Sequence, residues 1–483
     1  MTDLLRRHRW IATALALGVV VRVLVEVTFL PAFIYSDGPT YLALASSLSP
    51  SPDRTIGYSL LLHVLALATN AVWLVAVVQH LLGLATAVLV YALLRRWGVS
   101  GKVAALATVP VLFDEMELVL EHSIMSDVLF DLLLVLGVAV LAWRRPPPFL
   151  HVAAGGVLLA AAVLVRVVGE PVVLAALVFV LAVATTLRGR LLRCAVLVLT
   201  FGAPLVGYAA WYHSEVGAWA LSEAGGRALY MRTTAFVDCS VIDVPGYQRT
   251  LCPREPVGQR RDPTYYGWHD DRTVHAMVPP PGVTLDGALR DFAVTAIRTQ
   301  PLDYAKVVAR DFLMNFFPVR LNLFEYDTVY KWSFYHYVDY RPTDWTGPAY
   351  ATYGGEQPSS LHPVADAFKL YGWVVYLSGT LLLALLVLAI VGLVRPRHGA
   401  PPTRPLLFLT TALGVGLMLA PALTAEFTWR YQLPALVFLP MGAALAWTRL
   451  ATPRPSLAEV AGQEVAGQER AGQEGRTATP STD

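Results

Sequence analysis

Apolar runs long enough to cross a bilayer, which takes about 20 residues per helix, recur from end to end of this 483-residue chain. Hydrophobic residues make up 55% of the sequence and charged residues only 15%, whereas a soluble protein carries roughly a quarter charged residues. Such a chain cannot cover its surface with polar groups in water. We therefore predict an all-α polytopic membrane protein.

The apolar runs predict a bundle of ten transmembrane helices. The first run follows three arginines, is too long for a signal peptide and lacks a small-residue cleavage site, so we expect it to remain as a membrane helix. The predicted spans are approximately 10–33, 70–94, 103–120, 124–143, 149–168, 170–187, 194–212, 367–394, 405–424 and 431–448.

The connections between these spans alternate between basic and acidic. With the amino terminus in the cytoplasm, every basic connection also lies there, as the positive-inside rule requires. These connections contain Arg95, Arg96, Lys102, Arg144, Arg145, Arg188, Arg190, Arg193, Arg395, Arg397 and Arg404. The opposite connections contain Asp37, Asp53, Asp114, Glu115, Glu117, Glu121, Glu170 and Glu426. We therefore predict that the acidic connections face the extracytoplasmic side of the cell membrane. The net charge of +2 indicates no nucleic-acid partner.

This topology divides the chain into four parts. Residues 1–212 form a transmembrane core, whose first outer loop, at about 34–69, includes an apolar stretch too short to span the membrane. Residues 213–366 form an extracytoplasmic domain of mixed structure, and residues 367–448 form the C-terminal transmembrane helices. Residues 449–483 repeat Ala-Gly-Gln-Glu three times, and we predict a disordered cytoplasmic tail there.

Two of the three cysteines, Cys239 and Cys252, lie 13 residues apart in one polar loop. They are either two unrelated thiols or a disulfide. The disulfide is the favoured interpretation if the loop faces an oxidising compartment.

Three groups of acidic residues are candidates for chemistry. Asp37 follows the first predicted span in a Ser-Asp-Gly-Pro sequence that also suits an ordinary turn or a helix cap. Asp114 and Glu115 begin the next acidic connection, where a solvated loop is the alternative interpretation. Asp127 lies about one turn into the following predicted helix, so we expect it to face protein or water and not lipid.

Three arginines lie at the same predicted end of the bundle: Arg54 in the first outer loop, Arg166 at the outer end of the fifth span and Arg430 before the last span. An interfacial arginine often only extends its charged group to the headgroup region. Several arginines that converge with carboxylates instead suit a lipid-linked phosphate, whose oxygens accept paired guanidinium donors.

Motifs of several other enzyme classes are absent from the sequence. It has no Walker loop, no HExxH pair, no GxSxG elbow and no CxxC metal pair. Nucleotide hydrolysis, zinc proteolysis and serine-hydrolase chemistry therefore have no support, and no metal ligands are predicted from spacing.

Several short motifs near the predicted outer ends of the helices follow one another in the order found in a known enzyme family. Residues 37–43 read Asp-Gly-Pro-Thr-Tyr-Leu-Ala, close to an Asp-Glu-x-x-Tyr pattern followed by alanine, with Gly38 in place of the second carboxylate. Residues 54–59 read Arg-Thr-Ile-Gly-Tyr-Ser, close to a basic residue followed by Pro, Gly or Pro, Tyr and Pro, with Ile56 and Ser59 replacing the prolines. Further motifs are Ser-Asp at 126–127, Leu-x-Arg-x-x-Gly at 164–169 and Arg-Tyr-x-x-Pro at 430–434. The stretches 236–239 and 300–304 are similar to actinobacterial proteins with the same motifs. Up to about residue 448, the chain resembles the GT-C superfamily of membrane glycosyltransferases, especially the bacterial group related to protein O-mannosyltransferases and the aminoarabinose transferase of lipid A.

The resemblance implies a GT-C-like bundle that transfers a sugar, with inversion, from a polyprenyl-phosphate carrier to an acceptor hydroxyl of the cell envelope. It implies Asp37 as general base and Arg54, with Arg166 and Arg430, as the groups that neutralise the leaving phosphate. The residues expected to line the acceptor side or to hold an arginine are Tyr41, Tyr58, Asp114, Glu115 and Asp127. A divalent cation, Mg²⁺ or Mn²⁺, bridges carboxylate and phosphate in some relatives, but nothing in this sequence requires one.

Two other classes stay open. A transporter or flippase of a lipid-linked or amphipathic substrate also places charges near membrane helices, but it should show internal repeats and broken helices, and the sequence indicates neither. A non-catalytic binding protein would tolerate replacement of Asp37 by Asn.

Overall fold

The computed structural model describes residues 8–322, 328–354, 357–395 and 402–451. Their regular secondary structure is almost entirely helical, and two short strands, β1 (Phe29–Leu30) and β2 (Ser359–Ser360), pair antiparallel. The prediction of an all-α polytopic membrane protein is confirmed.

The helices lie in three stretches of the chain. The first stretch contains α2 (Arg9–Thr28), α3 (Gly38–Ser47), α4 (Gly57–Ala66), α5 (Trp73–Arg96), α6 (Gly101–Leu106), α7 (Val109–Phe113), α8 (Glu115–Glu121), α9 (Asp127–Ala142), α10 (Phe149–Val165), η1 (Val167–Gly169), α11 (Val172–Val183) and α12 (Leu187–Val216). The second contains α13 (Ala224–Thr234), η2 (Gly246–Leu251), η3 (Tyr265–His269), η4 (Val274–Ala276), α14 (Leu285–Thr299), α15 (Pro301–Met314), η5 (Val329–Trp332), α16 (Phe334–Tyr337), α17 (Gly347–Ala349) and η6 (Tyr350–Gly354). The third contains α18 (Val364–Val374), α19 (Gly379–Val394), α20 (Arg404–Thr424), η7 (Trp429–Gln432) and α21 (Leu433–Ala451).

Five helices of the described chain are long and apolar enough to cross a membrane: α2, α5, α12, α20 and the continuous stretch of η7 and α21. The pair α18 and α19, which is bent by 45° at a short break, adds a sixth. Helices α9, α10 and α11 occupy three other predicted spans but have only 16, 17 and 12 residues. The structure therefore supports a multi-pass bundle with fewer full-length spans than the ten predicted.

The predicted single span at 103–120 is wrong, because this region forms three short helices, α6, α7 and α8. Asp114 interrupts the helix with extended backbone, and its side chain accepts a hydrogen bond from the backbone N–H of Met116 at the start of α8. Pro110 stands in the first turn of α7, where its missing N–H costs no helical hydrogen bond. Broken helices, which the sequence did not indicate, are thus present.

Two predicted helix ends also differ. Helix α2 ends at Thr28 and not at 33, because Pro31 cannot continue a helix and disfavours the helical backbone of the residue before it. Helix α12 begins at Leu187 and runs to Val216, so the predicted boundary at 212 falls inside it.

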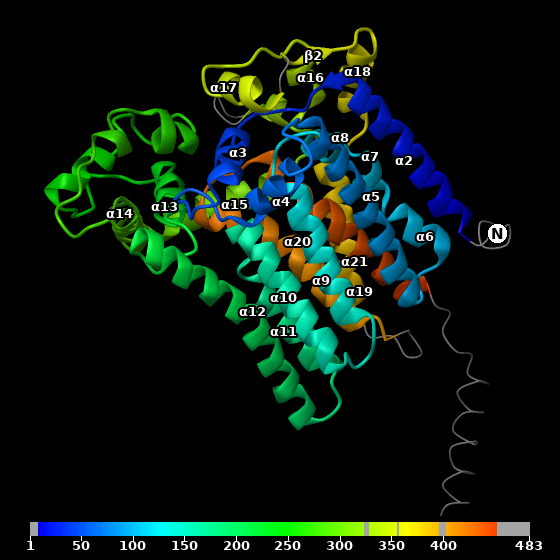
Figure 1. Cartoon of the computed structure of the whole chain (residues 1–483). Helices are drawn as coiled ribbons and strands as arrows, with labels where there is room; N and C mark the ends of the chain where they lie inside the picture. Colours follow the sequence, from blue (N-terminus) through cyan, green and yellow to red (C-terminus); the bar gives the residue numbers. More distant parts are fainter. Residues whose placement is uncertain (1–7, 323–327, 355–356, 396–401, 452–483) are drawn as a thin grey trace, which may run out of the picture.

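The basic connections meet at one end of the bundle. Arg96 donates a hydrogen bond to the carbonyl of Trp143, Arg193 donates to Pro147, and Arg145 donates to Pro402. Figure 1 shows α3 and α8, which flank the acidic connections, at the opposite end of the bundle from the turn between α11 and α12. The predicted separation of basic and acidic connections is therefore present in three dimensions.

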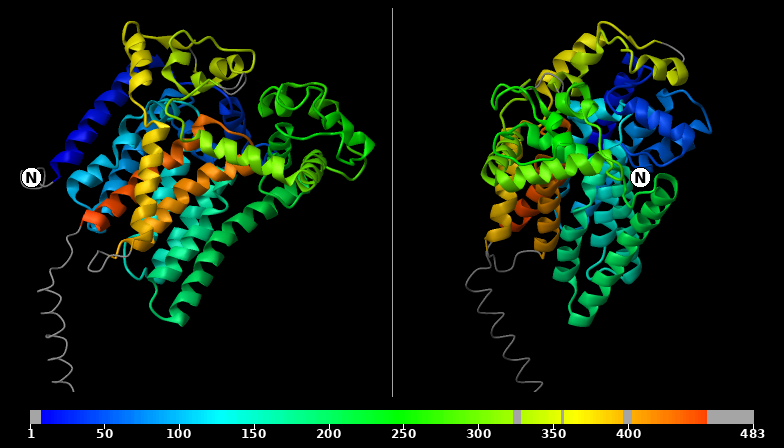
Figure 2. Two further views of the ribbon diagram at one scale, coloured as in Figure 1. Left: turned by 180° about the vertical axis from the view of Figure 1, so that it is seen from behind. Right: turned by 90° about the vertical axis from the view of Figure 1, so that its left-hand side faces the viewer.

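The predicted domain at 213–366 consists of two lobes on the acidic end (Figures 1 and 2). One lobe packs α13 against α14 around Tyr230 and Phe292, and a disulfide joins Cys239 to Cys252 within it. The other lobe, around α16, shares its core with α2 and α18. This second lobe covers the loop that leaves α2.

Candidate active site

The loop from 29 to 37 carries Asp37 to the acidic end of the bundle. Phe33 fastens this loop to the segment after α8: its N–H donates to the carbonyl of His122 (2.9 Å), and its own carbonyl accepts from the N–H of Ile124 (2.9 Å). Asp37 immediately precedes α3, but its side chain does not cap that helix. The interpretation of Asp37 as a side-chain helix cap is therefore wrong, and its carboxylate is available for other partners.

The Asp37 carboxylate binds two of the predicted arginines. Arg54 Nη2 donates to Asp37 Oδ1 at 2.7 Å, and Arg430 Nη2 donates to Asp37 Oδ2 at 3.3 Å. The side chains of Asp37 and Arg430 are 17% and 11% exposed, so the group is largely screened from solvent. One carboxylate thus holds guanidinium groups from the first outer loop and from the start of the last span.

The charge environment of Asp37 determines its protonation state. Burial disfavours the charged carboxylate, but the positive charges of Arg54 and Arg430 outweigh this effect and hold the pKa of Asp37 well below its usual range. In this arrangement Asp37 is a stable anion and a weak base.

The third predicted arginine lies beside this group. Arg166 Nη1 pairs with Asp127 Oδ1 at 2.5 Å. The guanidinium carbons of Arg166 and Arg430 lie 5.8 and 5.5 Å from the ring centre of Tyr431. Both arginines, Asp127 and the ring of Tyr431 also line one narrow cavity. The structure therefore brings Asp37, Asp127 and all three predicted arginines together.

That cavity is too small for a ligand as it stands. Its volume is about 10 Å³, which is room for about one water molecule. Asp131, one turn after Asp127, also lines the cavity and is 2% exposed, and within the described chain neither of its carboxylate oxygens has a hydrogen-bond partner. A phosphate group enters this place only if side chains move.

The two predicted tyrosines, Tyr41 and Tyr58, are buried beside the site and form hydrogen bonds with neighbouring helices. The Tyr41 hydroxyl lies 3.0 Å from Ser126 Oγ, and the Tyr58 hydroxyl donates to Gln79 Oε1 at 2.8 Å. Burial, together with the charge of Asp37, raises the pKa of Tyr41, so its phenol stays protonated. Tyr58 is fully buried, with its ring against that of Tyr41. Tyr58 therefore joins α4 to Tyr41 of α3 and to Gln79 of α5.

Asp114 and Glu115 belong to a different cluster. Asp114 pairs with Arg320 (3.2 Å) and accepts a hydrogen bond from the N–H of Leu377 (2.7 Å). Glu115 accepts from the N–H of Phe334 at 2.9 Å. Arg320 precedes the second lobe, Phe334 lies in it and Leu377 follows it. These two carboxylates therefore join that lobe to α8. Sequence analysis did not identify Arg320, because its partner is more than two hundred residues away.

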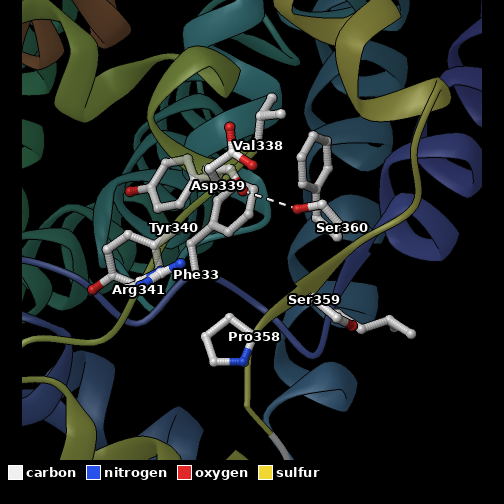
Figure 3. A pocket seen from close by; sticks show the side chains of 11 residues that line it. Phe33, Val338, Asp339, Tyr340, Arg341, Pro358, Ser359 and Ser360 are labelled. Atoms are coloured by element: carbon white, nitrogen blue, oxygen red, sulfur yellow. Dashed lines mark hydrogen bonds between the residues drawn. The ribbon is translucent and has the colours of Figure 1, made fainter.

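A larger cavity, of about 250 Å³, lies on another side of the 29–37 loop. Figure 3 shows Phe33, Tyr340 and Arg341 around it, with Ser360 bonded to a backbone carbonyl of the second lobe. Neither cavity is lined by Asp37 or Arg54, but Asp127, Arg166 and Arg430 line the narrow cavity and none of them lines this one. We identify the candidate active site by the charged residues gathered around the narrow cavity. The greater volume of the second cavity is not used as a criterion.

Fold and site together define a class: a multi-pass membrane protein with a buried group of carboxylates and arginines at the acidic end of its helix bundle. Residues 63–222 match the family model described as dolichyl-phosphate-mannose-protein mannosyltransferase. This match confirms the predicted resemblance to the GT-C glycosyltransferases. The matched region contains Asp127 and Arg166, whereas Asp37, Arg54 and Arg430 lie outside it. No curated protein and no solved structure matches the chain.

Proposed function

We propose that this protein transfers a sugar from a polyprenyl-phosphate carrier to a hydroxyl group of a cell-envelope acceptor, at the extracytoplasmic face of the cell membrane. The observation that carries the proposal is the Asp37 carboxylate held between Arg54 and Arg430. The match to a mannosyltransferase family favours a glycosyltransferase that uses a lipid-linked donor of this kind.

In this proposal the two arginines exchange partners when the donor binds. Phosphate oxygens accept paired guanidinium donors at least as well as a carboxylate does. Arg54 and Arg430 turn from Asp37 to the donor phosphate, and the pKa of Asp37 then rises because the positive charges that lowered it have moved. Asp37 becomes a base only when the donor is present.

The reaction then inverts the anomeric centre. The acceptor oxygen attacks the anomeric carbon from the face opposite the phosphate, and the bond from that carbon to the phosphate oxygen breaks with its electrons going to the leaving polyprenyl phosphate. Asp37 takes the acceptor proton. Arg54 and Arg430 stabilise the charge that develops on the phosphate, and Asp127 keeps Arg166 beside them.

The transfer is tested with purified protein in detergent and a panel of polyprenyl-phosphate hexoses and pentoses, in the presence of an envelope extract as acceptor. We expect one donor to be consumed, with release of polyprenyl phosphate and sugar incorporated into the extract. Parallel reactions with a chelator, Mg²⁺ or Mn²⁺ decide whether a cation assists. A flippase would move the donor between leaflets of a liposome and leave it intact, which would contradict the proposal.

The orientation is tested with single cysteines at two exposed apolar positions. Val278 lies on the first lobe and is 77% exposed, whereas Leu187 begins α12 at the basic end and is 71% exposed. In a Cys194→Ser background, an impermeant maleimide added to intact cells should label Val278→Cys and should label Leu187→Cys only after lysis. The reverse pattern would place the site on the cytoplasmic side.

A further inference from the structure

Three side chains from distant segments converge beneath the 29–37 loop: Glu26 of α2, His80 of α5, and His122 directly after α8. Their atoms Glu26 Oε2, His80 Nε2 and His122 Nδ1 all lie within 4.8 Å of one another. The two ring nitrogens are 3.3 Å apart, and the carboxylate oxygen lies 3.4 Å from His122 Nδ1 and 3.8 Å from His80 Nε2. His122 is fully buried and His80 nearly so.

In each histidine, the ring nitrogen that points away from the other two side chains already has a hydrogen-bond partner. His80 Nδ1 lies 2.7 Å from Glu121 Oε2, and Glu121 forms an ion pair with Arg22, whose Nη2 lies 2.5 Å from its other oxygen. His122 Nε2 lies 2.6 Å from the carbonyl of Phe29. A carboxylate and a carbonyl only accept hydrogen bonds, so both ring nitrogens must donate. In the neutral rings the other nitrogens, which face each other, therefore carry lone pairs.

This leaves three acceptors facing one another with no donor between them. Glu26 Oε2 is buried, and within the described chain it has no hydrogen-bond partner. A cation satisfies all three acceptors at once, either as an extra proton on one imidazole or as a metal ion. The separation fits a metal ion, because two nitrogens bound to tetrahedral Zn²⁺ at ~2.0–2.1 Å lie about 3.3 Å apart, the distance found here.

We propose that Glu26, His80 and His122 bind a divalent transition-metal ion of the Zn²⁺ type. Two imidazoles and a carboxylate are ligands that such ions accept. The hydrogen bonds from His80 to Glu121 and from His122 to Phe29 are the outer contacts that orient metal-bound histidines in proteins. No ligand of this site belongs to the Asp37 group, so this ion is distinct from any cation at the donor phosphate.

The role of the ion is structural. It ties the end of α2 to α5 and to the segment that carries Ser126 and Asp127. The ring of Phe33 packs edge-on against His122, with ring centres 4.7 Å apart, and the backbone of Phe33 is bonded to this same segment. The metal thereby fixes the loop that presents Asp37, so its loss loosens the site without removing a reacting group.

The test measures metal content and thermal stability, not sugar transfer, so it stands apart from the proposed function. Full-length protein is purified with a tag that contains no histidine, stripped with a chelator, and equilibrated with Zn²⁺ alone. We expect about one bound Zn²⁺ per chain by mass spectrometry and a higher melting temperature than that of the stripped protein. Co²⁺ in place of Zn²⁺ should give the visible absorption of a histidine-ligated ion.

Matched variants assign the ligands. Glu26→Gln and His122→Gln should each lower Zn²⁺ affinity at least tenfold, whereas His63→Gln should leave it unchanged, because His63 is a partly buried histidine outside this group that is bonded to the carbonyl of Ala45. Glu26→Gln keeps the shape of a side chain that is 20% exposed, so it is the variant expected to fold. Absence of Zn²⁺ from the wild-type protein, or equal Zn²⁺ content in Glu26→Gln and His63→Gln, would overturn the proposal and leave a protonated histidine pair.

Discussion

Replacing Asp37 with Asn should lower the rate of sugar transfer by about 10²–10⁴-fold, the usual contribution of a positioned general base. The amide has nearly the same shape, still accepts a hydrogen bond from Arg54, and takes up no proton from the acceptor. Donor binding should not weaken, because a neutral amide competes with the phosphate for Arg54 and Arg430 less than the Asp37 carboxylate does. Release of polyprenyl phosphate under single-turnover conditions measures the effect.

Asp53→Asn is the matched control for this change. Asp53 is one residue from Arg54 in the same loop, is exposed, and contacts Arg54 through its backbone carbonyl, which the substitution keeps. It should retain full activity. Both variants should elute from size exclusion as the wild type does. Normal transfer by a folded Asp37→Asn protein would remove Asp37 from the role of base and favour a binding function for the whole group.

Replacing Arg54 with Gln should lower turnover by about 10²–10³-fold, as loss of one preorganised donor to a developing oxyanion does elsewhere. Arg54→Lys should be intermediate, because an ammonium keeps the charge but lacks the paired donors of a guanidinium. Arg290→Gln provides the control: it removes the same charge from an exposed arginine that pairs with the buried Asp286 in the first lobe, and its activity should match that of the wild type.

The pH profile of the Arg54 variant separates an electrostatic role from a merely structural one. Asp37 must be deprotonated to act as base, so activity falls as pH drops through its pKa. Arg54 lowers that pKa; its removal therefore raises the pKa, and the acid limb of kcat/KM should move to higher pH. An acid limb that stays in place while the rate falls would show that Arg54 acts on the fold and not on Asp37.

Much of the architecture was predictable from local sequence. Hydropathy identified the helical bundle, and the alternation of arginine-rich and acidic connections correctly separated the two ends of the molecule. The errors occurred where a polar residue changed local geometry. The stretch 103–120 is apolar enough for one span, but the carboxylate of Asp114 bonds the N–H of Met116 and starts a new helix there.

The candidate site was predictable in its residue types but not in its pairings. Asp37 and Arg54 are 17 residues apart, and motif reading placed both in one outer loop. Arg430 reaches the same carboxylate from 393 residues away. Its motif identified it as a candidate, but nothing in the sequence showed that it meets Asp37 or that Arg320 meets Asp114. Local sequence likewise did not show that the hydroxyls of Tyr41 and Tyr58 have the different partners Ser126 and Gln79.

The sequence by itself determined most of the apolar helical segments and which end of the bundle is acidic, because hydropathy and the placement of arginines are properties of each segment alone. Only the tertiary structure decided which guanidinium meets which carboxylate, and that Glu26, His80 and His122 face one another. Those contacts depend on the packing of helices that are far apart in the chain, and a shift of one turn in any of them would separate the partners by about 5 Å.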